Sequence, residues 1–285
     1  MNEAVAGPER VRIDGVEGGC LDPADRGLQY GDGLFETIAI VDGSARRWPA
    51  HVARLQAGCA RLGIPAPSRA RLEAELAALA PARGRAVLKL LLTRGGGGRG
   101  YRPPARPRPT LVASLHQWPA WPAGLHQAGA RVRWCRTPLP LDPATAGIKH
   151  LNRLPQVLAR AEWEDPAIFE GLMLDPRGRV VCGTMSNLFC RIGDTLLTPP
   201  LKEAGVAGIL RQEVLERAAG LGMVVREGTL RPRDVEEARE VFLTNSLIEI
   251  LPVTALAGAT RPVGEWTRAL AIALGGERGG AAPGA

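Results

Sequence analysis

The sequence predicts an α+β protein with two domains. Three observations carry this prediction: short apolar segments typical of strands, segments with helical spacing between them, and a break at Trp118–Gly124 that holds two prolines and a glycine. A chain of 285 residues suits one large domain or two smaller ones. We therefore expect a small N-terminal α/β domain, a linker, a larger C-terminal domain and a disordered tail, over residues 1–117, 118–125, 126–276 and 277–285.

The expected N-terminal domain combines strands with two helices. Helical spacing of apolar residues predicts a helix at Ala50–Leu62, and Ser68 opens a second helix that ends at Leu79. Asp42-Gly43 is a hairpin-turn pair, joining the strand that ends at Val41 to the segment Arg46–Trp48. Glycine and proline dominate residues 95–109, which predicts a mobile loop. The expected strands are Val11–Ile13, Thr37–Val41, Val87–Leu92 and Thr110–Leu115.

The expected C-terminal domain continues the alternation. It starts with a strand at Ala130–Trp134, and a helix that follows Lys149 runs to Trp163. Turns are expected at Pro176–Gly178 and Gly193-Asp194. The remaining strands are expected at Gly171–Leu174, Arg179–Cys182, Leu188–Ile192, Thr195–Leu197, Met223–Arg226 and Val241–Thr244, and the remaining helices at Gly208–Leu221 and Pro232–Ala238.

Composition narrows the class of protein. No apolar run approaches the roughly 20 residues of a membrane helix, and Met1–Ala4 lacks the basic start and apolar core of a signal peptide. The five cysteines form no CxxC pair, which indicates reduced thiols in the cytoplasm and argues against a metal site. The net charge of +7 permits nucleic-acid binding, but with 4% aromatic residues no stacking platform is visible. An acidic small-molecule substrate explains the charge equally well.

Lys149 is the most informative single residue. The chain carries 33 arginines and only three lysines, at positions 89, 149 and 202. A desolvated lysine amine can lose its proton and form a Schiff base, which a guanidinium cannot do. Lys149 precedes an amphipathic helix with apolar residues on one side, namely Leu151, Leu154, Val157 and Leu158. The alternative is an ordinary exposed lysine at the start of a helix.

Three further segments suit an anionic ligand. His51 and Arg54 lie about one turn apart on the first predicted helix, and an arginine can bind a phosphate through two hydrogen bonds. Gly205–Arg211 is a glycine-flanked turn into a helix, whose first N–H groups are unpaired and attract anions. The segment 244–246, Thr-Asn-Ser, adds hydroxyl and N–H groups after a strand. Together with a reactive lysine, they describe a pocket for a phosphorylated aldehyde, pyridoxal phosphate.

The ordered motifs of the chain resemble the fold-type IV enzymes that depend on pyridoxal phosphate. This family includes branched-chain and D-amino-acid aminotransferases and aminodeoxychorismate lyases. The context of Lys149 and the Gly-Arg-Gly-Tyr loop most resemble the lyases. The motifs are Tyr30-Gly-Asp-Gly-Leu-Phe-Glu36, His51-x-x-Arg54-Leu55, Arg99-Gly-Tyr101, Gly147-Ile-Lys-His-Leu-Asn-Arg153, Ser186-Asn-Leu-Phe189 and Gly205-Val-x-Gly208-Ile209-x-Arg211.

The resemblance implies the cofactor, the fold and the residues of the site. Lys149 would form the Schiff base with pyridoxal phosphate, and Arg54 would bind the phosphate. A mixed or barrel-like sheet is implied for the larger domain, as is a homodimer in which a neighbour's loop closes each site. The other implied cofactor-binding residues are Cys182, Asn187, Gly208, Ile209, Asn245 and Ser246.

The lyase resemblance implies the conversion of 4-amino-4-deoxychorismate to 4-aminobenzoate and pyruvate, a step of folate synthesis. Lys149 would take the ring C4 proton and return a proton to the departing enolpyruvate. Because the substrate is a dicarboxylate, Arg99, Tyr101, Lys89 and Tyr30 are the residues expected to bind it. Strand alternation leaves open whether Lys89 instead faces solvent.

Cys182 departs from the family pattern. Most members carry a glutamate five residues before the Asn that corresponds to Asn187, and it pairs with the pyridine nitrogen. A thiol ionises only above about pH 8.5 unless it is perturbed, so Cys182 is a poor partner for that nitrogen. A transaminase needs a strong electron sink more than a reaction driven by aromatisation does. The substitution therefore favours the lyase over the aminotransferase, and reduced activity is the other reading.

Two alternatives remain. An aminotransferase for D- or branched-chain amino acids would require a pocket built for an α-carboxylate, and the Arg99-Gly100-Tyr101 loop weighs against it. A basic RNA-binding module would bind RNA in a strongly salt-dependent manner and would carry no chromophore.

Overall fold

The computed structural model describes residues 7–275, and the chain divides into two compact units. Unit 1 comprises the residues up to Ala120 together with Ile148–Asn152, and unit 2 comprises Trp121–Gly147 and the residues from Arg153 onward. The segment that carries Lys149 therefore groups with unit 1, whereas the sequence placed it inside the C-terminal domain. The expected tail at 277–285 and the N-terminal segment Met1–Ala4 lie outside the described residues.

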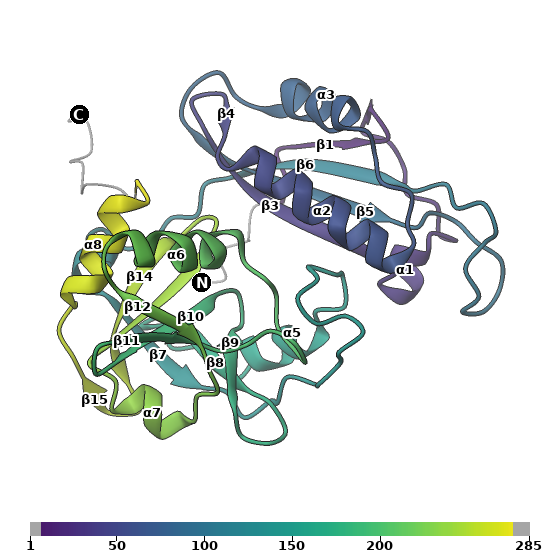
Figure 1. Ribbon diagram of the computed structural model, residues 1–285. Helices are drawn as coiled ribbons and strands as arrows, with labels where there is room; N and C mark the ends of the chain where they lie inside the picture. The colour runs from purple at the N-terminus through teal and green to yellow at the C-terminus, as the bar shows by residue number, and fades with distance from the viewer. Residues whose placement is uncertain (1–6, 276–285) are drawn as a thin grey trace. The chain divides into compact units, whose positions relative to one another are not determined.

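Unit 1 is built on a six-stranded antiparallel sheet (Figure 1). The strand order is β2-β1-β6-β5-β3-β4, and the long central pair β3–β5 runs in unbroken register from Gly33↔Thr93 to Val41↔Arg85. Each strand that the sequence predicted in this unit is present. The strands are β1 (Arg10–Ile13), β2 (Val16–Glu17), β3 (Gly33–Val41), β4 (Ser44–Ala45), β5 (Arg85–Thr93) and β6 (Leu111–Gln117).

Two helices cover one face of this sheet: α2 (Trp48–Leu62) packs against β3, and α3 (Arg69–Leu79) against β6. Alternate residues of β3, such as Leu34 and Ile38, are buried with both helices in one apolar core. The Ser68 hydroxyl accepts a hydrogen bond from Arg71 N, so the predicted start of α3 is confirmed. A short helix that the sequence did not predict, α1 (Arg26–Tyr30), precedes β3.

The hairpin turn at Asp42-Gly43 is present, with both residues at positive φ. The strand after it is only Ser44–Ala45, so it ends before Arg46–Trp48, the segment expected to follow the turn. The physical reason is that Trp48 and Pro49 already form the first turn of α2, where a proline is well tolerated.

Unit 2 is built on a nine-stranded mixed sheet. Its order is β12-β11-β10-β13-β14-β7-β8-β9 with β15 on β14, and the pairs β11–β12, β14–β7 and β7–β8 are parallel. β9 also contacts β10 although four strands separate them in the order, so the sheet curls. This confirms the predicted barrel-like core. The strands are β7 (Ala130–Trp134), β8 (Ile168–Leu174), β9 (Val180–Gly183), β10 (Asn187–Ile192), β11 (Thr195–Thr198), β12 (Val224–Glu227), β13 (Glu240–Asn245), β14 (Glu249–Leu256) and β15 (Ala259–Thr260).

The helices of unit 2 include one long helix, α6, that packs with α8 on β13 and its neighbours. Neither β14 nor α8 was predicted from the sequence. For β14 the reason is Pro252, which lies within the strand and interrupts its apolar pattern. The helix after Lys149 is α5, which is much shorter than the expected segment to Trp163. The helices are α4 (Leu125–Ala128), α5 (Leu154–Arg160), α6 (Ile209–Gly220), α7 (Pro232–Glu236) and α8 (Glu265–Ala273).

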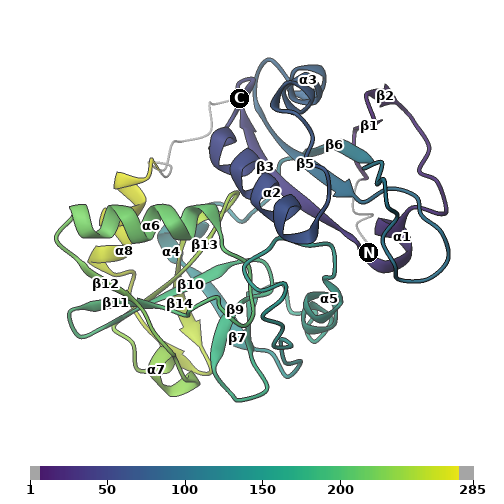
Figure 2. The same cartoon turned by 45° about the vertical axis from the view of Figure 1, so that its right-hand side comes forward.

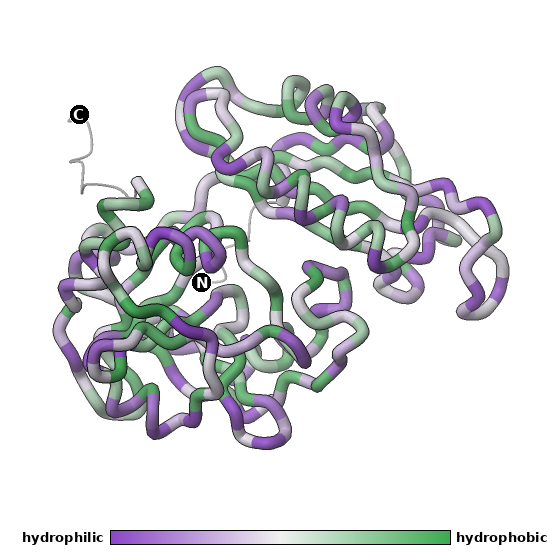
Figure 3. Tube along the Cα trace, viewed as in Figure 1, coloured by the Kyte–Doolittle hydropathy of each residue, from purple (hydrophilic) through white to green (hydrophobic). Residues whose placement is uncertain are grey.

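Hydropathy follows this architecture. Figure 3 shows hydrophobic stretches along the strands of each unit and hydrophilic stretches on loops and on the outer faces of helices. Within residues 7–275, none of the helices combines the length and the apolar content that a membrane crossing requires.

Candidate active site

Lys149 is held on unit 1 by backbone pairing. Its carbonyl oxygen accepts a hydrogen bond from Phe35 N at 2.9 Å, and Leu151 N donates to Gly33 O at 3.0 Å. The two bonds add the segment to the start of β3 like a short extra strand. Ile148 anchors the same segment in the apolar core of the unit. The position of the Lys149 backbone is thereby fixed by the sheet, and its side chain is half-buried.

The side chain of Lys149 lies over an aromatic ring. Its Nζ is 4.1 Å from the centroid of the Phe35 ring, and Nζ of Lys89 is 5.8 Å from the same centroid. Lys89 therefore projects from β5 toward the face of the sheet that carries Phe35 and Lys149. Two of the three lysines of the chain therefore lie near one ring, and Lys89 is partly exposed there.

Glu36 is a buried carboxylate that joins two residues of α2. Arg54 donates from Nε at 2.8 Å and from a terminal nitrogen at 2.5 Å, while His51 Nδ1 lies 2.6 Å from Glu36 Oε2. Burial works to raise the pKa of Glu36, but hydrogen bonds from Arg54 and His51 outweigh it and leave the pKa below its usual value. The two hydrogen bonds to Glu36 fix the guanidinium plane of Arg54, the residue expected to bind a phosphate.

His51 is 1% exposed, and its Nε2 finds no hydrogen-bond partner among the described residues. Desolvation lowers the pKa of the imidazole, Glu36 opposes this, and the positive charges of Arg54 and Lys149 lower it further. The charges of Arg54 and Lys149 thus act on the same ring. Glu36 was inside a motif that the sequence singled out, but its role as the shared partner of His51 and Arg54 was missed.

Besides Lys89 on β5, the residues expected to bind substrate carboxylates lie on a loop and a short helix of unit 1. Tyr101 is exposed, and its ring meets Tyr30 edge-on, with centroids 5.4 Å apart. Arg99 is exposed on the same loop. The expectation of a loop without helix or strand is confirmed for residues 95–109, although Gly96 makes one bridge to Asp25.

In unit 2, Asn187 and Gly208 are neighbours. Asn187 begins β10, and its Nδ2 donates to Val206 O at 2.9 Å. Gly208 is the N-cap of α6, and a Cβ in place of its hydrogen would overlap Oδ1 of Asn187. Glycine is therefore required at this position by close approach, and it leaves the start of the helix open.

The start of α6 has the properties of an anion site. No side chain caps it, and no acidic residue lies in its first turn, so the first N–H groups lack a side-chain acceptor from the cap. Thr244 is 1% exposed and stands directly across from Asn187 in the sheet, so both side chains share one face. The hydroxyl of Thr244 finds no partner in the described part of the chain. These groups fit a phosphate, as pyridoxal phosphate requires.

Asn245 organises the turn after β13. Its Oδ1 accepts hydrogen bonds from Leu247 N and Ile248 N at 2.9 Å each, and its Nδ2 lies 3.2 Å from Met185 O. Ser246 lies inside this turn and is partly exposed. The structure therefore gives Asn245 a role in shaping the turn, and Ser246 the accessible hydroxyl.

Cys182 lies in β9 and is buried beside Glu170. Burial, followed by the charge of Glu170, raises the pKa of the Cys182 thiol to about 12, while the charge of Arg153 acts in the opposite direction. The thiol is thus neutral at physiological pH, and more firmly so than an ordinary cysteine.

Glu170 was not expected from the sequence. It is fully buried, and its two oxygens accept hydrogen bonds from residues 184–186 and from its own neighbour Gly171. Burial raises the pKa of Glu170, and these donors oppose the rise. The donors are Gly171 N, Thr184 N, Thr184 Oγ1, Met185 N and Ser186 Oγ. Glu170 therefore fixes the turn that leads into Asn187.

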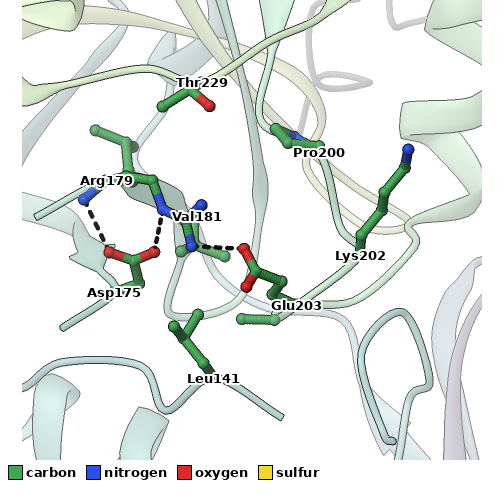
Figure 4. A pocket seen from close by; sticks show the side chains of 10 residues that line it. Leu141, Asp175, Arg179, Val181, Pro200, Lys202, Glu203 and Thr229 are labelled. Atoms are coloured by element: carbon green, nitrogen blue, oxygen red, sulfur yellow. Dashed lines mark hydrogen bonds and ion pairs between the residues drawn. The ribbon is translucent and has the colours of Figure 1, made fainter. Parts of the chain in front are cut away.

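A cavity of about 230 Å³ lies elsewhere in unit 2. Figure 4 shows Arg179 between Asp175 and Glu203, with Lys202 pointing away from them. None of the predicted cofactor or substrate residues is among its described lining residues. The third lysine of the chain therefore lines this cavity of unit 2, whereas the pair at Phe35 belongs to unit 1.

Residues 33–256 match the model of the family described as amino-transferase class IV. The chain belongs to this family. Membership confirms the predicted fold type and the prediction of an enzyme that depends on pyridoxal phosphate.

Individual relatives differ in activity. The chain is 36% identical to an aminodeoxychorismate lyase of Vibrio harveyi, over 86% of this chain and 92% of that one. It is 30% identical to a D-alanine aminotransferase of Bacillus licheniformis, over 84% of each. Among solved structures, it resembles 4-amino-4-deoxychorismate lyase from Pseudomonas aeruginosa with a TM-score of 0.88 and 48% identity, over 93% of this chain and 97% of that one.

Proposed function

We propose that the chain is a 4-amino-4-deoxychorismate lyase, which forms 4-aminobenzoate and pyruvate. The observation that carries the proposal is the 48% identity to the Pseudomonas aeruginosa lyase over nearly the whole of both chains. The match to a D-alanine aminotransferase at 30% identity keeps an aminotransferase as the second candidate. The residues of the site bear on the choice between them.

Lys149 is proposed as the catalytic residue. When bound, pyridoxal phosphate supplies an aldehyde for a Schiff base and a ring that withdraws electrons from the substrate. The Lys149 backbone is fixed against β3, so its Nζ can return to one position after each proton transfer. Nζ would take the proton from ring C4 of the substrate and then deliver a proton to the departing enolpyruvate.

The phosphate is proposed to bind at Arg54, at the N–H groups of Gly208 and Ile209, and at a hydroxyl of the turn after β13. Glu36 orients Arg54, and the open start of α6 supplies the N–H groups. Ser246 is the hydroxyl that the sequence proposed, and Thr244 joins it because its buried hydroxyl faces the same side as Asn187.

The two carboxylates of the substrate are proposed to bind Arg99 and Lys89, with Tyr30 and Tyr101 beside them. An exposed arginine on a loop and a lysine next to Lys149 provide positive charge at two separate points of unit 1. A monocarboxylic amino acid would use only one of these points, so the pair favours the lyase.

The decisive experiment combines a spectrum with product detection. Purified protein should absorb at roughly 410–430 nm, the range of a lysine Schiff base with pyridoxal phosphate, and should release pyruvate from 4-amino-4-deoxychorismate. Lys149→Arg should abolish both signals, while the matched change Lys202→Arg should leave both intact because Lys202 lines a cavity to which none of the proposed site residues contributes. A yellow protein that ignores this substrate but loses its colour with D-alanine would establish the aminotransferase instead.

Cys182 offers a second discrimination. Its thiol stays neutral, so it provides no negative charge to hold a proton on the pyridine nitrogen. In Cys182→Glu, side transamination should rise relative to lyase turnover, since only the carbanion of transamination depends strongly on that proton. An unchanged ratio of the two rates would remove Cys182 as an argument for the lyase.

A homodimer is proposed from the surface of α5. Leu154, Val157 and Leu158 have helical spacing on one side of α5 and are 66%, 60% and 54% exposed. A second copy of the chain is the proposed occupant, because the same apolar face on each copy can pair about a two-fold axis. Leu158→Glu should shift the mass measured by sedimentation to that of a monomer, whereas Ile272→Glu on the exposed side of α8 should not. A monomeric wild type would refute the proposal.

A further inference from the structure

Arg26 reaches from α1 to the loop that carries Arg99 and Tyr101. It is 4% exposed, and its guanidinium donates hydrogen bonds to three consecutive carbonyl oxygens of the loop. The distances are 2.9 Å to Tyr101 O, 3.1 Å to Gly100 O and 3.5 Å to Arg102 O. Figure 2 shows α1 beside this loop. A buried side chain thus holds the backbone of an exposed loop.

The other side of the guanidinium is anchored in the fold of unit 1. Its Nε donates to Asp32 at 2.9 Å, and the same carboxylate accepts two hydrogen bonds from Arg94. Arg94 in turn donates to the last carbonyl oxygens of α2, at Leu62 and Gly63. Burial works to raise the pKa of Asp32, but the hydrogen bonds from Arg94 and Arg26 lower it below its usual value, so the carboxylate stays charged.

Charge explains why the loop is held. Two guanidinium groups share the single carboxylate of Asp32, so the charge of Arg26 is only partly matched by its ion pair. The carbonyl oxygens of residues 100–102 supply the remaining acceptors. If the loop left, N–H groups of a buried cation would lose their partners, and burial without partners is costly.

Aromatic contacts add little to the attachment of the loop to α1. The Arg26 guanidinium lies 4.9 Å from the centroid of the Tyr30 ring, which meets Tyr101 edge-on. Tyr101 is 83% exposed, so its ring contributes little buried surface to hold the loop. The hydrogen bonds of Arg26 are therefore the principal tie between the loop 99–102 and α1.

We propose that Arg26 is the positioning residue of the site: it fixes the backbone of residues 100–102 and so presents Arg99 and Tyr101 to the carboxylates of the substrate. The claim that Arg99 and Tyr101 are presented to the substrate rests on the proposed function. Lysine cannot replace Arg26, because one ammonium group lacks the planar fork that binds Asp32 on one side and the loop on the other.

Proteolysis tests, without substrate, whether Arg26 fixes the backbone of residues 100–102. Trypsin does not cut before proline, and Arg102, Arg106 and Arg108 all precede proline, so Arg99 is the one exposed cleavage point of the loop. Cleavage after Arg99, followed by mass spectrometry of the products 1–99 and 100–285, should become at least tenfold faster in both Arg26→Gln and Arg26→Lys.

The matched control is Arg94→Gln. Arg94 is equally buried and binds the same carboxylate, but it donates no hydrogen bond to residues 99–102. Its cleavage after Arg99 should stay within about twofold of the wild type. Arg26→Lys preserves the buried charge beside Asp32 and carries the test if Arg26→Gln does not fold. Unchanged cleavage in Arg26→Lys overturns the proposal.

Steady-state kinetics test whether the loop held by Arg26 presents Arg99 and Tyr101 to the substrate. In Arg26→Lys, KM for 4-amino-4-deoxychorismate should rise at least fivefold while kcat changes less than threefold and the visible absorbance stays that of the wild type. Faster cleavage with an unchanged KM would overturn the link to the substrate. A wild type without lyase activity would refute the proposed function alone, because the cleavage assay requires no substrate.

Discussion

The close approach of Gly208 to Asn187 makes a quantitative prediction. In Gly208→Ala, the new methyl group would overlap Oδ1 of Asn187 and lie 3.3 Å from its Cγ. Asn187 is 7% exposed at the start of β10, so its side chain can move only by giving up its hydrogen bond to Val206 O. The backbone of Gly208 has φ −67°, so the substitution introduces no backbone strain. The effect is therefore one of packing and hydrogen bonding.

The lost hydrogen bond costs about 1 kcal/mol and the displaced core side chain about 1–3 kcal/mol, so the free energy of unfolding should fall by about 2–4 kcal/mol. The same helix offers a matched control at Gly220, where a Cβ would meet nothing within 4 Å. Gly220→Ala should gain about 0.5–1 kcal/mol, because alanine loses less conformational entropy in a helix.

Urea unfolding of both variants, followed by tryptophan fluorescence, measures this difference. The protein should first be stripped of pyridoxal phosphate, because a bound ligand adds its own stabilisation. Equal shifts for the two alanine variants, or a Gly208→Ala midpoint equal to that of the wild type, would refute the packing argument. A lowered affinity for pyridoxal phosphate in Gly208→Ala should accompany the loss of stability.

Three further predictions concern titratable groups. The pKa of Glu36 lies below its unfolded value, so its stabilisation is present above about pH 4.5 and is lost as the pH falls through the folded pKa. Urea unfolding of Glu36→Gln should therefore show a deficit of about 3 kcal/mol at pH 7 that shrinks toward pH 3. The pKa of Glu170 is raised, so its contribution is full below its unfolded pKa and is lost as the pH rises through the folded pKa. Glu170→Ala should accordingly lose more unfolding free energy at pH 5 than at pH 8, and the opposite trend would exclude this sign. Of the five cysteines only Cys20 is exposed, so a thiol reagent should label one residue in the native protein and five in urea.

Local signals predicted most of the elements. The helix start at Ser68 and the turn at Asp42-Gly43 depend on neighbouring residues alone, so the sequence was sufficient for both. β14 could not be predicted in this way, because Pro252 breaks its pattern and only pairing with β13 and β7 makes it a strand. Helix α5 shows a similar limit: the sequence predicted its apolar side, but not that the apolar side chains there are exposed.

The sequence motifs predicted which residues belong to the candidate site, but not the contacts that hold them. Lys149 was selected by its rarity, but its contact with Phe35 depends on backbone pairing with a strand more than a hundred residues earlier. The partners of the named residues were the principal omission. Glu36 binds side chains of α2, and Arg26 binds carbonyl groups of a loop, 75 residues later at Tyr101. No periodic pattern marks such contacts.

The chain path through unit 1 has a consequence for dividing the protein. A gene cut after Ala120 would encode a first fragment without Ile148, which belongs to its apolar core, and without the segment that pairs with β3. The five missing residues, Ile148–Asn152, would be carried by the other fragment. The first product would not be a self-sufficient domain, and any complementation of the two fragments would have to add those five residues back onto β3, bringing Lys149 with them.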